Sequence, residues 1–367
     1  MLQQRCPCGG TLLARYDLDG LSLDDVRRRP AGMWRYRELL PVQGDPVSLG
    51  EPETALLALP HLSERWGCEV FLKDDGGLAG GTFKARGAAA GLSRAAELGA
   101  SGVVMPSAGN AGGAWSLYAA RARMPITVTM ARTAPRANQA EVRSAGGELV
   151  LVDGTIADAG RQAVEIARSR GAFLATTFSE PYRLEGKKSC WLEVFDRFGD
   201  GTAMRFPKTI VLPVGGGVAA VAAAKGAEEV AAAGLCGDDP PAVVGVQAAG
   251  CAPVVRAFRT GADEVEPWER APETVAAGLR VPRPPEGALL LRSLRASGGA
   301  MIEVDDDAII SAISGLASSE GVFACPEGAA AVAATERLAR AGRLEGPVVV
   351  YNTGAGAKYA TDLAERL

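Results

Sequence analysis

Short apolar runs alternate with alanine-rich and amphipathic stretches along most of this chain. Four runs between residues 100 and 185 have the length and the branched side chains of buried strands: 101–105, 126–130, 148–152 and 172–176. Helical patterns such as 112–123 and 157–170 separate them. Strands that alternate with helices in this way predict a compact four-stranded α/β unit.

A second group of apolar runs lies outside that unit and predicts a larger parallel sheet: 69–73, 209–212, 243–247 and 348–351. The alanine-rich stretch 220–233 predicts a helix after the second of these runs. Residues 261–285 are rich in proline and glutamate, so they predict a surface loop, which can also act as a lid.

A lysine stands in the small-residue turn that follows the run 69–73. The turn reads Gly-Gly-Thr-Phe-Lys-Ala-Arg-Gly over residues 80–87 and places Lys84 before an alanine-rich helix. A lysine that is held where it loses its proton forms a Schiff base with a carbonyl cofactor, most commonly pyridoxal phosphate. The same motif also fits a helix start with an exposed lysine, so the turn alone leaves both interpretations open.

Two further turns follow apolar runs and suit the same cofactor. The run 209–212 leads into Pro-Val-Gly-Gly-Gly-Val-Ala at 213–219, where backbone N–H groups and a helix N-terminus are typical of a phosphate site. Its spacing matches neither dinucleotide nor Walker-type triphosphate binding, and a glycine triplet also serves as a plain tight turn. After the run 348–351, Thr353 offers a hydroxyl that can hydrogen-bond the pyridine nitrogen of a bound ring.

Taken in order along the chain, these turns and several other short motifs resemble fold type II pyridoxal-phosphate enzymes, and among them the threonine synthase family. The motifs stand at 32–41, 81–87, 106–114, 180–188, 278–282, 320–330 and 352–354. The resemblance implies an α/β fold of the tryptophan synthase β type, with two parallel-sheet domains and the site in the cleft between them. It implies an N-terminal cysteine-containing segment at 1–29, a larger cofactor-binding domain at 30–99 and 186–367, and a smaller mobile domain at 100–185.

The resemblance also implies roles for individual residues. Lys84 carries the Schiff base, and Phe83 packs beside the cofactor ring. Asn110 contacts the hydroxyl of the ring, and Thr353 contacts its nitrogen. The cofactor phosphate is held by residues of the glycine turn: Val214, Gly215, Gly216, Gly217 and Val218.

A substrate carboxylate fits the helix start that follows the run 101–105, which comprises Ser107, Ala108, Gly109, Asn110 and Ala111. Ser107 fits equally well as a plain N-cap. Arg183 suits a substrate phosphate because of its bidentate fork, and Lys187 or Lys188 adds positive charge. The alternative for Arg183 is an ion pair with Glu185 or with another carboxylate.

By resemblance the chain is a pyridoxal-phosphate-dependent lyase, a threonine synthase that converts O-phosphohomoserine and water into threonine and phosphate by γ-elimination and β-addition. It departs from the family pattern at 78–80, at Ala111 and at 177–178, where polar residues are common. These departures leave open β-replacement, as in cysteate or cysteine synthases, and β-elimination, as in threonine or serine dehydratases. A non-catalytic binding protein is disfavoured because Lys84 is present.

Composition argues against some classes of partner, and the resemblance implies a small-molecule amino-acid substrate. A net charge of −4 over 367 residues argues against a nucleic-acid or anionic-membrane surface, and no apolar run reaches the length of a membrane span. Seven cysteines in apolar contexts indicate a reducing, cytoplasmic setting, and the resemblance implies a homodimer. Cys6 and Cys8 form one pair, and the single histidine, His61, is distant in sequence, so no metal site is predicted. We expect the N-terminal segment to pack on the body, and His61 to lie exposed at a helix start.

Overall fold

The computed structural model describes residues 5–107 and 109–367, and within them the chain divides into two compact units. Unit 1 draws on Met1–Leu18, Arg29–Pro52 and Leu78–Ser189. Unit 2 draws on Asp19–Arg28, Glu53–Gly77 and Cys190–Leu367. Each unit has a sheet and an apolar core of its own, which is the layered arrangement expected of α/β proteins.

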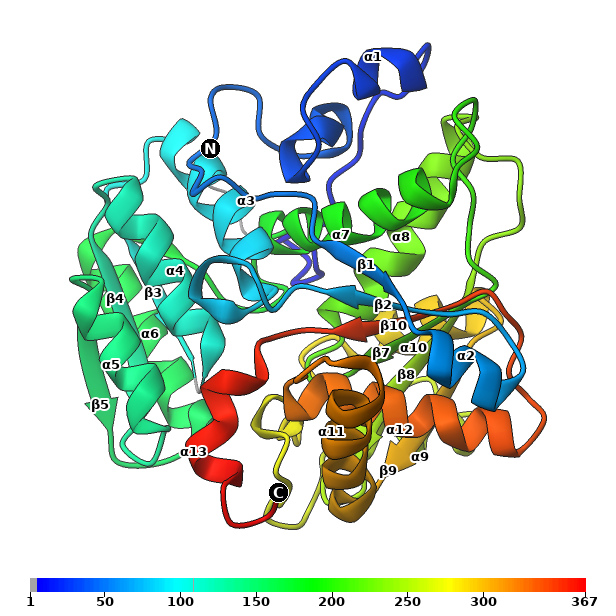
Figure 1. The fold of residues 1–367 in the computed structure, drawn as a ribbon. Helices are drawn as coiled ribbons and strands as arrows, with labels where there is room; N and C mark the ends of the chain where they lie inside the picture. Colours follow the sequence, from blue (N-terminus) through cyan, green and yellow to red (C-terminus); the bar gives the residue numbers. More distant parts are fainter. Residues whose placement is uncertain (1–4, 108) are drawn as a thin grey trace. The chain divides into compact units, whose positions relative to one another are not determined.

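Unit 1 is built on a parallel sheet whose four strands, among the described residues, follow the order β5-β4-β3-β6 (Figure 1). Its elements are η1 (Met33–Leu39), η2 (Ala79–Gly81), α3 (Lys84–Glu97), β3 (Val103–Pro106), α4 (Asn110–Arg121), β4 (Ile126–Ala131), α5 (Arg136–Ser144), β5 (Glu148–Val152), α6 (Ile156–Arg170), β6 (Phe173–Leu174) and α7 (Tyr182–Phe198), whose residues from 190 on belong to unit 2.

The core of unit 1 gathers α3 and α4 over strands β3 and β4. Six small residues along α3 are fully buried, so neighbouring helices can approach its backbone closely: Ala85, Gly87, Ala88, Ala89, Ala90 and Gly91. A Cβ atom on Gly91 would lie 2.3 Å from the Trp115 ring of α4. The glycine therefore makes room for the largest side chain of this core.

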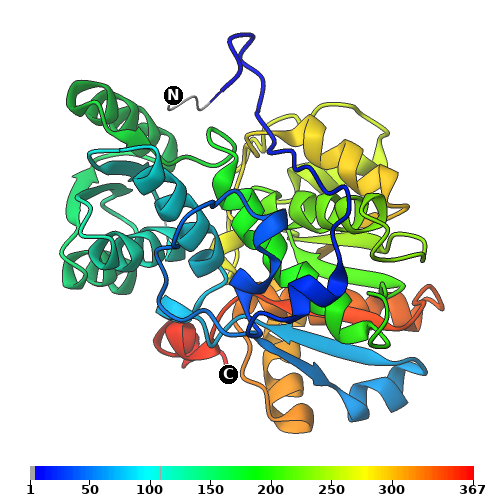
Figure 2. The same ribbon diagram turned by 90° about the horizontal axis from the view of Figure 1, so that it is seen from above.

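The N-terminal residues of unit 1 pack on its body, as expected. Residues 5–22 contain no helix or strand in the described part of the chain and run as the dark blue segment in Figure 2. Thr11 donates to the carbonyl of Phe178 (3.3 Å), and Tyr16 donates to Glu185 of α7 (3.0 Å).

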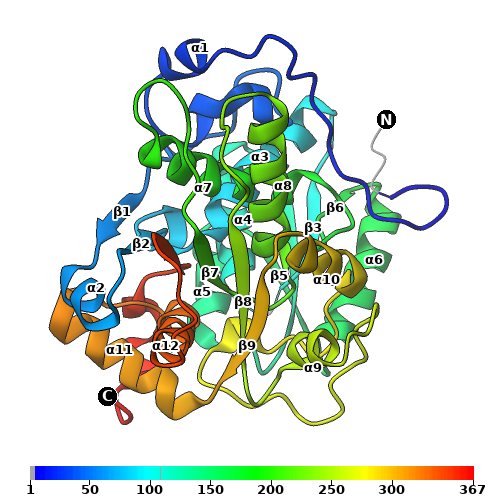
Figure 3. The ribbon, with the colours of Figure 1, turned by 90° about the vertical axis from the view of Figure 1, so that its right-hand side faces the viewer.

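Unit 2 contains a sheet whose six strands, in the described residues, follow the order β1-β2-β10-β7-β8-β9. All neighbours are parallel except β1, which pairs antiparallel with β2 at one edge. Figure 3 shows β7, β8 and β9 side by side. The elements of unit 2 are α1 (Leu23–Arg27), β1 (Ala55–Ala58), α2 (Pro60–Trp66), β2 (Val70–Asp74), β7 (Thr209–Pro213), α8 (Val218–Ala232), β8 (Ala242–Ala248), α9 (Pro253–Arg259), η3 (Ala277–Leu279), α10 (Gly287–Ala296), β9 (Ala300–Val304), α11 (Asp306–Glu320), α12 (Pro326–Arg340), β10 (Val348–Asn352), η4 (Gly356–Tyr359) and α13 (Ala360–Leu363).

Helices cover both faces of this sheet, with α8 on one side and α11 and α12 on the other (Figure 1). Helix α12 lies directly on β10 and β7, and eleven of its residues are buried. Strands that are covered on both faces read as continuous apolar runs, which is why β7 and β10 stand out in the sequence.

The eight strands predicted from apolar runs are all present, and their ends agree within two residues. Sequence reasoning missed β1 and β9, because β1 is a short, mostly exposed edge strand and β9 contains a glutamate. Residues 260–286 form a loop that contains only the short η3 turn, and His61 is exposed in the first turn of α2, as predicted. None of the described helices is long and apolar enough to cross a membrane.

Candidate functional site

Lys84 opens helix α3 in unit 1, and the ring of Phe83 lies beside its amine. The buried Thr82 precedes them and accepts a hydrogen bond from the Lys84 backbone N–H (3.4 Å). The Nζ atom of Lys84 lies 3.9 Å from the centroid of the Phe83 ring, and the lysine side chain is half-buried. The fully exposed lysine that the motif also allowed is therefore not what the structure shows.

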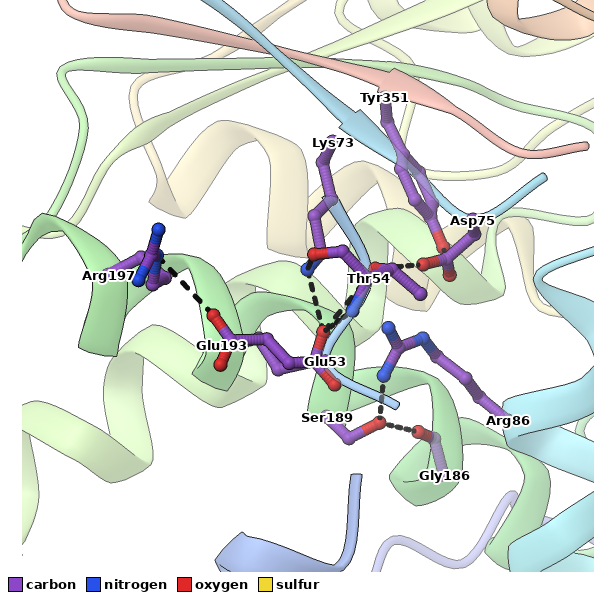
Figure 4. A network of polar contacts seen from close by, with 10 residues as sticks. All are labelled: Glu53, Thr54, Lys73, Asp75, Arg86, Gly186, Ser189, Glu193, Arg197 and Tyr351. Atoms are coloured by element: carbon purple, nitrogen blue, oxygen red, sulfur yellow. Dashed lines mark hydrogen bonds and ion pairs between the residues drawn. The ribbon is translucent and has the colours of Figure 1, made fainter. Parts of the chain in front are cut away.

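Helix α7 crosses α3 closely at a pair of glycines. A Cβ atom on Gly186 would lie 2.2 Å from the Arg86 carbonyl, and one on Gly87 would lie 3.0 Å from the Arg183 carbonyl. The buried Arg86 donates to Ser189 (2.9 Å), which in turn donates to the Gly186 carbonyl (2.7 Å), as Figure 4 shows. This contact fixes the position of the α7 side chains relative to the start of α3.

Arg183 sits in the first turn of α7 with one edge of its guanidinium already bonded. Its Nε donates to Glu180 (2.5 Å) and its Nη1 approaches the Thr177 hydroxyl (3.4 Å). The Nη2 atom is buried and has no hydrogen-bond partner within the described residues, and the guanidinium carbon lies 4.9 Å from the centroid of the Trp115 ring. A buried donor without a partner is costly, so this atom marks a place where an anion binds favourably.

Glu180 is the carboxylate that pairs with Arg183: the sequence left open an ion pair with Glu185 or with another carboxylate, and the structure shows the second. Burial raises the pKa of Glu180, while the bonded Arg183 opposes that rise. Glu180 also accepts from the backbone N–H of Arg183 (3.0 Å), so it acts at the helix N-terminus as well. The three-residue spacing of an acid before an arginine at a helix start is the signal that identifies it. Glu185 instead pairs with Lys188 (2.6 Å).

Lys187 lies one turn after Arg183 on α7 and is almost fully buried. Its Nζ atom is 5.2 Å from the centroid of the Phe83 ring, the same ring that Lys84 contacts. Burial and the charges of Lys84 and Arg183 hold the pKa of Lys187 well below the ordinary lysine value. The structure thus brings together Phe83, Lys84, Arg183 and Lys187, four of the residues predicted from sequence.

The start of α4 presents backbone N–H groups after strand β3. The Ser107 hydroxyl accepts from the backbone N–H groups of Gly112 (2.9 Å) and Gly109 (3.2 Å), so it satisfies donors at this helix start, whose N-cap residue is Gly109. Gly109 and Asn110 are half-buried at the helix start, as is Ala111 in the first turn. Ala108, also predicted to bind substrate, lies outside the described residues.

In unit 2 the predicted glycine turn joins β7 to α8 and is tightly enclosed. Val214 is fully buried, Gly216 is half-buried, and Gly217 adopts a φ of 82°, which favours glycine. A Cβ atom on Gly215 would lie 2.4 Å from the Gly278 carbonyl. Among the described residues no side chain caps the start of α8, so its first N–H groups from Val218 on suit an anion.

Thr353 follows β10, the strand next to β7, so it and the glycine turn lie at the same edge of the sheet. Its hydroxyl lies 3.5 Å from the Cys325 sulfur, and Cys325 donates to the Asn352 side chain (3.3 Å). Burial, together with the nearby Glu327 carboxylate, raises the pKa of the Cys325 thiol to about 12. The thiol is therefore neutral, so Cys325 contacts the Thr353 hydroxyl without placing a negative charge beside it.

The neighbouring strand β2 ends in a buried polar network (Figure 4). Lys73 pairs with Glu193 (2.6 Å) and donates to the Thr54 carbonyl (2.9 Å). Asp75 accepts from the hydroxyls of Thr54 (2.7 Å) and Tyr351 (2.6 Å). These bonds satisfy the buried charges and hold the carboxyl end of β2 against β10.

The described residues hold no group of three or more His, Cys, Asp or Glu side chains able to bind a metal ion. The free Cys6 and Cys8 lie in the N-terminal segment, where Cys8 is exposed. The hydrogen bond from Cys6 lowers the pKa of the Cys8 thiol.

Comparison with known proteins identifies the family. Residues 47–354 match the model of the pyridoxal-phosphate dependent enzymes. The chain is 32% identical to threonine synthase of Methanosarcina acetivorans over 95% of this chain and 85% of the relative, and 32% identical to that of Methanocaldococcus jannaschii over 96% and 88%.

Solved structures share the fold at lower identity. A maize serine racemase matches with a TM-score of 0.74 and 21% identity over 94% of this chain and 96% of that chain. The processed form of threonine deaminase isoform 2 from Solanum lycopersicum matches with a TM-score of 0.72 and 21% identity over 96% of each chain. The fold type II architecture expected from the sequence is confirmed. The chain belongs to the pyridoxal-phosphate-dependent enzymes, it resembles the threonine synthases among them, and pyridoxal phosphate is its cofactor.

Proposed function

We propose that this enzyme is a threonine synthase, which converts O-phosphohomoserine and water into threonine and phosphate by γ-elimination and β-addition. The observation that carries the proposal is the buried guanidinium of Arg183, whose Nη2 has no partner within the described residues. A phosphate dianion satisfies such a donor better than a neutral group does. The similarity to threonine synthases over most of the chain supports the same reaction.

The residues present fit pyridoxal phosphate. The tight glycine turn and the uncapped start of α8 suit its phosphate, the half-buried Lys84 suits its aldehyde, and the Phe83 ring suits its flat face. Asn110 suits its ring hydroxyl, and Thr353 suits its ring nitrogen. When bound, the cofactor supplies an electron sink for charge that develops on the substrate.

Lys84 has two duties in this proposal. Its Nζ atom binds the cofactor aldehyde, and when released it takes the proton from the α-carbon of the substrate. An amine accepts a proton only in its neutral form, and the Lys84 side chain is half-buried beside the Phe83 ring. Thr353 offers the ring nitrogen of the cofactor a neutral hydroxyl rather than a carboxylate. A neutral partner at this nitrogen favours elimination and replacement reactions.

Two helix starts orient the substrate in this proposal. The N–H groups at the start of α4, from Asn110 and Ala111, bind its carboxylate, while Ser107 holds the helix start in shape. The Nη2 atom of Arg183 binds its phosphate, and Glu180 holds the guanidinium in one orientation. The positive charge of Arg183 also stabilises the phosphate as it leaves.

β-Replacement or β-elimination on another amino acid is the second candidate. The observation that favours it is Phe178, which is buried and adopts a φ of 61° where some family members have a polar residue. A non-glycine residue in this conformation is strained, and strain of this kind clusters at functional sites. An apolar side chain here favours a smaller or less charged substrate. A homodimer in the cytoplasm remains a further proposal.

The deciding experiment incubates the purified enzyme with O-phosphohomoserine, O-phosphoserine, serine and threonine, and measures phosphate, ammonia and amino-acid products. We expect threonine and phosphate in equal amounts from O-phosphohomoserine. Ammonia from serine or threonine at a higher specificity constant would instead assign the enzyme to the eliminating class.

The glycine turn gives a test of cofactor binding. In Gly215→Ala the new Cβ meets the Gly278 carbonyl, a backbone atom that cannot rotate away, so the turn must open. Overpacking of this kind costs about 1–3 kcal/mol, and we expect the affinity for pyridoxal phosphate to fall by about tenfold or more. Absorbance titration of the cofactor-free protein measures this.

Gly315→Ala is the matched control for this variant, since its new Cβ meets nothing within 4 Å in helix α11. We expect Gly315→Ala to leave cofactor affinity unchanged. Equal affinity in Gly215→Ala, Gly315→Ala and the unmutated protein would place the cofactor phosphate away from this turn.

A further inference from the structure

Lys187 differs from two other buried lysines in lacking an acidic partner. Lys73 pairs with Glu193 and Lys188 pairs with Glu185, in each case at 2.6 Å and with both side chains fully buried. Lys187 forms no ion pair with any carboxylate of the described residues, although only 6% of its surface is exposed. A buried ammonium without a carboxylate is costly, whereas a buried neutral amine is not.

The surroundings of Lys187 are mostly cationic. Its side chain runs across Gly87 of α3, where Cε is 3.3 Å from a Cβ built on that glycine. Lys84 faces it from α3 and Arg183 faces it from its own helix. The one carboxylate that acts on it, Glu180, is already bonded to Arg183.

The amines of Lys84 and Lys187 lie beside the same aromatic ring. The Nζ atoms of Lys84 and Lys187 lie 3.9 Å and 5.2 Å from the centroid of Phe83. Two positive charges beside one ring in a partly buried place repel, so the pair favours holding one proton over holding two. Burial is greater at Lys187, which makes Lys187 the neutral member, and its pKa is lowered accordingly.

We propose that Lys187 is a second base of this site, a buried neutral amine that shares a single proton with Lys84 around the ring of Phe83. The role of Lys187 as a base rests on the proposed function, because γ-elimination removes a proton from the β-carbon of the substrate as well as from its α-carbon. Nζ of Lys187 accepts the β-proton, the electron pair of that C–H bond forms the Cβ–Cγ double bond, and phosphate leaves with the electrons of the C–O bond.

The first test needs neither cofactor nor substrate. The cofactor-free protein is treated with an amine-acylating reagent over a range of pH, and the labelling of each lysine is followed by peptide mass spectrometry. We expect Lys187 to be labelled from a lower pH than the exposed reference Lys208. In Lys84→Met we expect the Lys187 curve to move to higher pH, because a neighbouring positive charge is gone.

A substitution of Lys187 tests the same coupling at the amine of Lys84. Lys187→Arg carries a permanent charge, so we expect the labelling curve of Lys84 to move to lower pH. A Lys187 curve that coincides with that of Lys208, or one that does not move in Lys84→Met, would overturn the amine pair.

The second test separates a base from a ligand for the substrate anion. Arginine keeps the positive charge but cannot accept a proton, whereas glutamine loses both functions. If Lys187 is a second base, we expect kcat on O-phosphohomoserine to fall about 10²–10⁴-fold in both Lys187→Arg and Lys187→Gln, with little change in KM. Recovery of activity in Lys187→Arg, with a raised KM only in Lys187→Gln, would make Lys187 an anion ligand.

The labelling test fails independently of the proposed function. If the labelling shows the coupled pair but the unmutated enzyme does not act on O-phosphohomoserine, threonine synthesis is wrong and the amine pair stands. If the enzyme makes threonine but Lys187 labels as an ordinary lysine, the second base is wrong and threonine synthesis stands.

Discussion

Lys84→Ala is expected to abolish both turnover and the visible absorbance of lysine-bound cofactor while the protein remains folded. Lys84 is the residue proposed to bond covalently to the cofactor, so no neighbouring group replaces it by charge or by shape. The side chain is half-buried at the first residue of α3, and alanine is a better helix former than lysine there. We therefore expect the melting temperature to change little.

Borohydride reduction followed by peptide mapping identifies the lysine that binds the cofactor. We expect the label on the peptide that contains Lys84, and none in the variant. Lys208→Ala, at an exposed position of unit 2, is the control and should retain both label and turnover. A label on Lys187 in the unmutated enzyme would reverse the roles assigned to the two amines.

The fold of this enzyme follows from its sequence because its strands are of the buried parallel kind. Strands such as β4, β7 and β10 are covered on both faces, and their continuous branched runs are visible in the sequence. The edge strand β1 is half-covered at most and pairs antiparallel, so it leaves no such run. The boundary between the two units falls inside helix α7, where periodicity shows no break.

Only part of the site could be predicted from sequence. The glycine turn and Thr353 stand directly after apolar runs, where parallel strands present their ligand-binding edge, and Lys84 lies in the small-residue turn that follows another run, so the sequence singles out these positions. The environment of Lys187 was not, because it depends on helix α7 crossing α3 at Gly87. The sequence also allowed Ser107 to be an N-cap or a ligand; the N-cap of α4 is Gly109, and the Ser107 hydroxyl accepts from the N–H groups of Gly109 and Gly112.

Arg183→Leu is expected to remove activity on phosphorylated substrates selectively. Loss of a charged hydrogen-bond partner in a largely buried site costs about 2–5 kcal/mol, or roughly one and a half to four orders of magnitude in kcat/KM. Deamination of serine or threonine should stay within a small factor, because neither molecule carries a phosphate. Steady-state assays on O-phosphohomoserine and on serine measure the two effects side by side.

The control for this variant has to separate substrate binding from folding. Leucine leaves the buried Glu180 without its partner, so the pKa of Glu180, already raised by burial, rises further. A raised carboxyl pKa destabilises the folded state as pH increases through it, so Arg183→Leu should melt at a higher temperature in acid than at neutral pH. The double variant Glu180→Gln/Arg183→Leu removes both charges, and we expect it to regain thermal stability without regaining activity on the phosphorylated substrate.

Arg183→Lys completes the series, because it keeps the charge but not the two-pronged geometry. If Arg183 binds phosphate, lysine should restore only part of the lost kcat/KM, since a point charge cannot bond both Glu180 and the phosphate in one plane. Equal losses on serine and on O-phosphohomoserine across all three variants would show that Arg183 supports the fold or binds the carboxylate common to both substrates. A loss confined to the phosphorylated substrate would leave the buried Nη2 donor as the determinant of substrate choice.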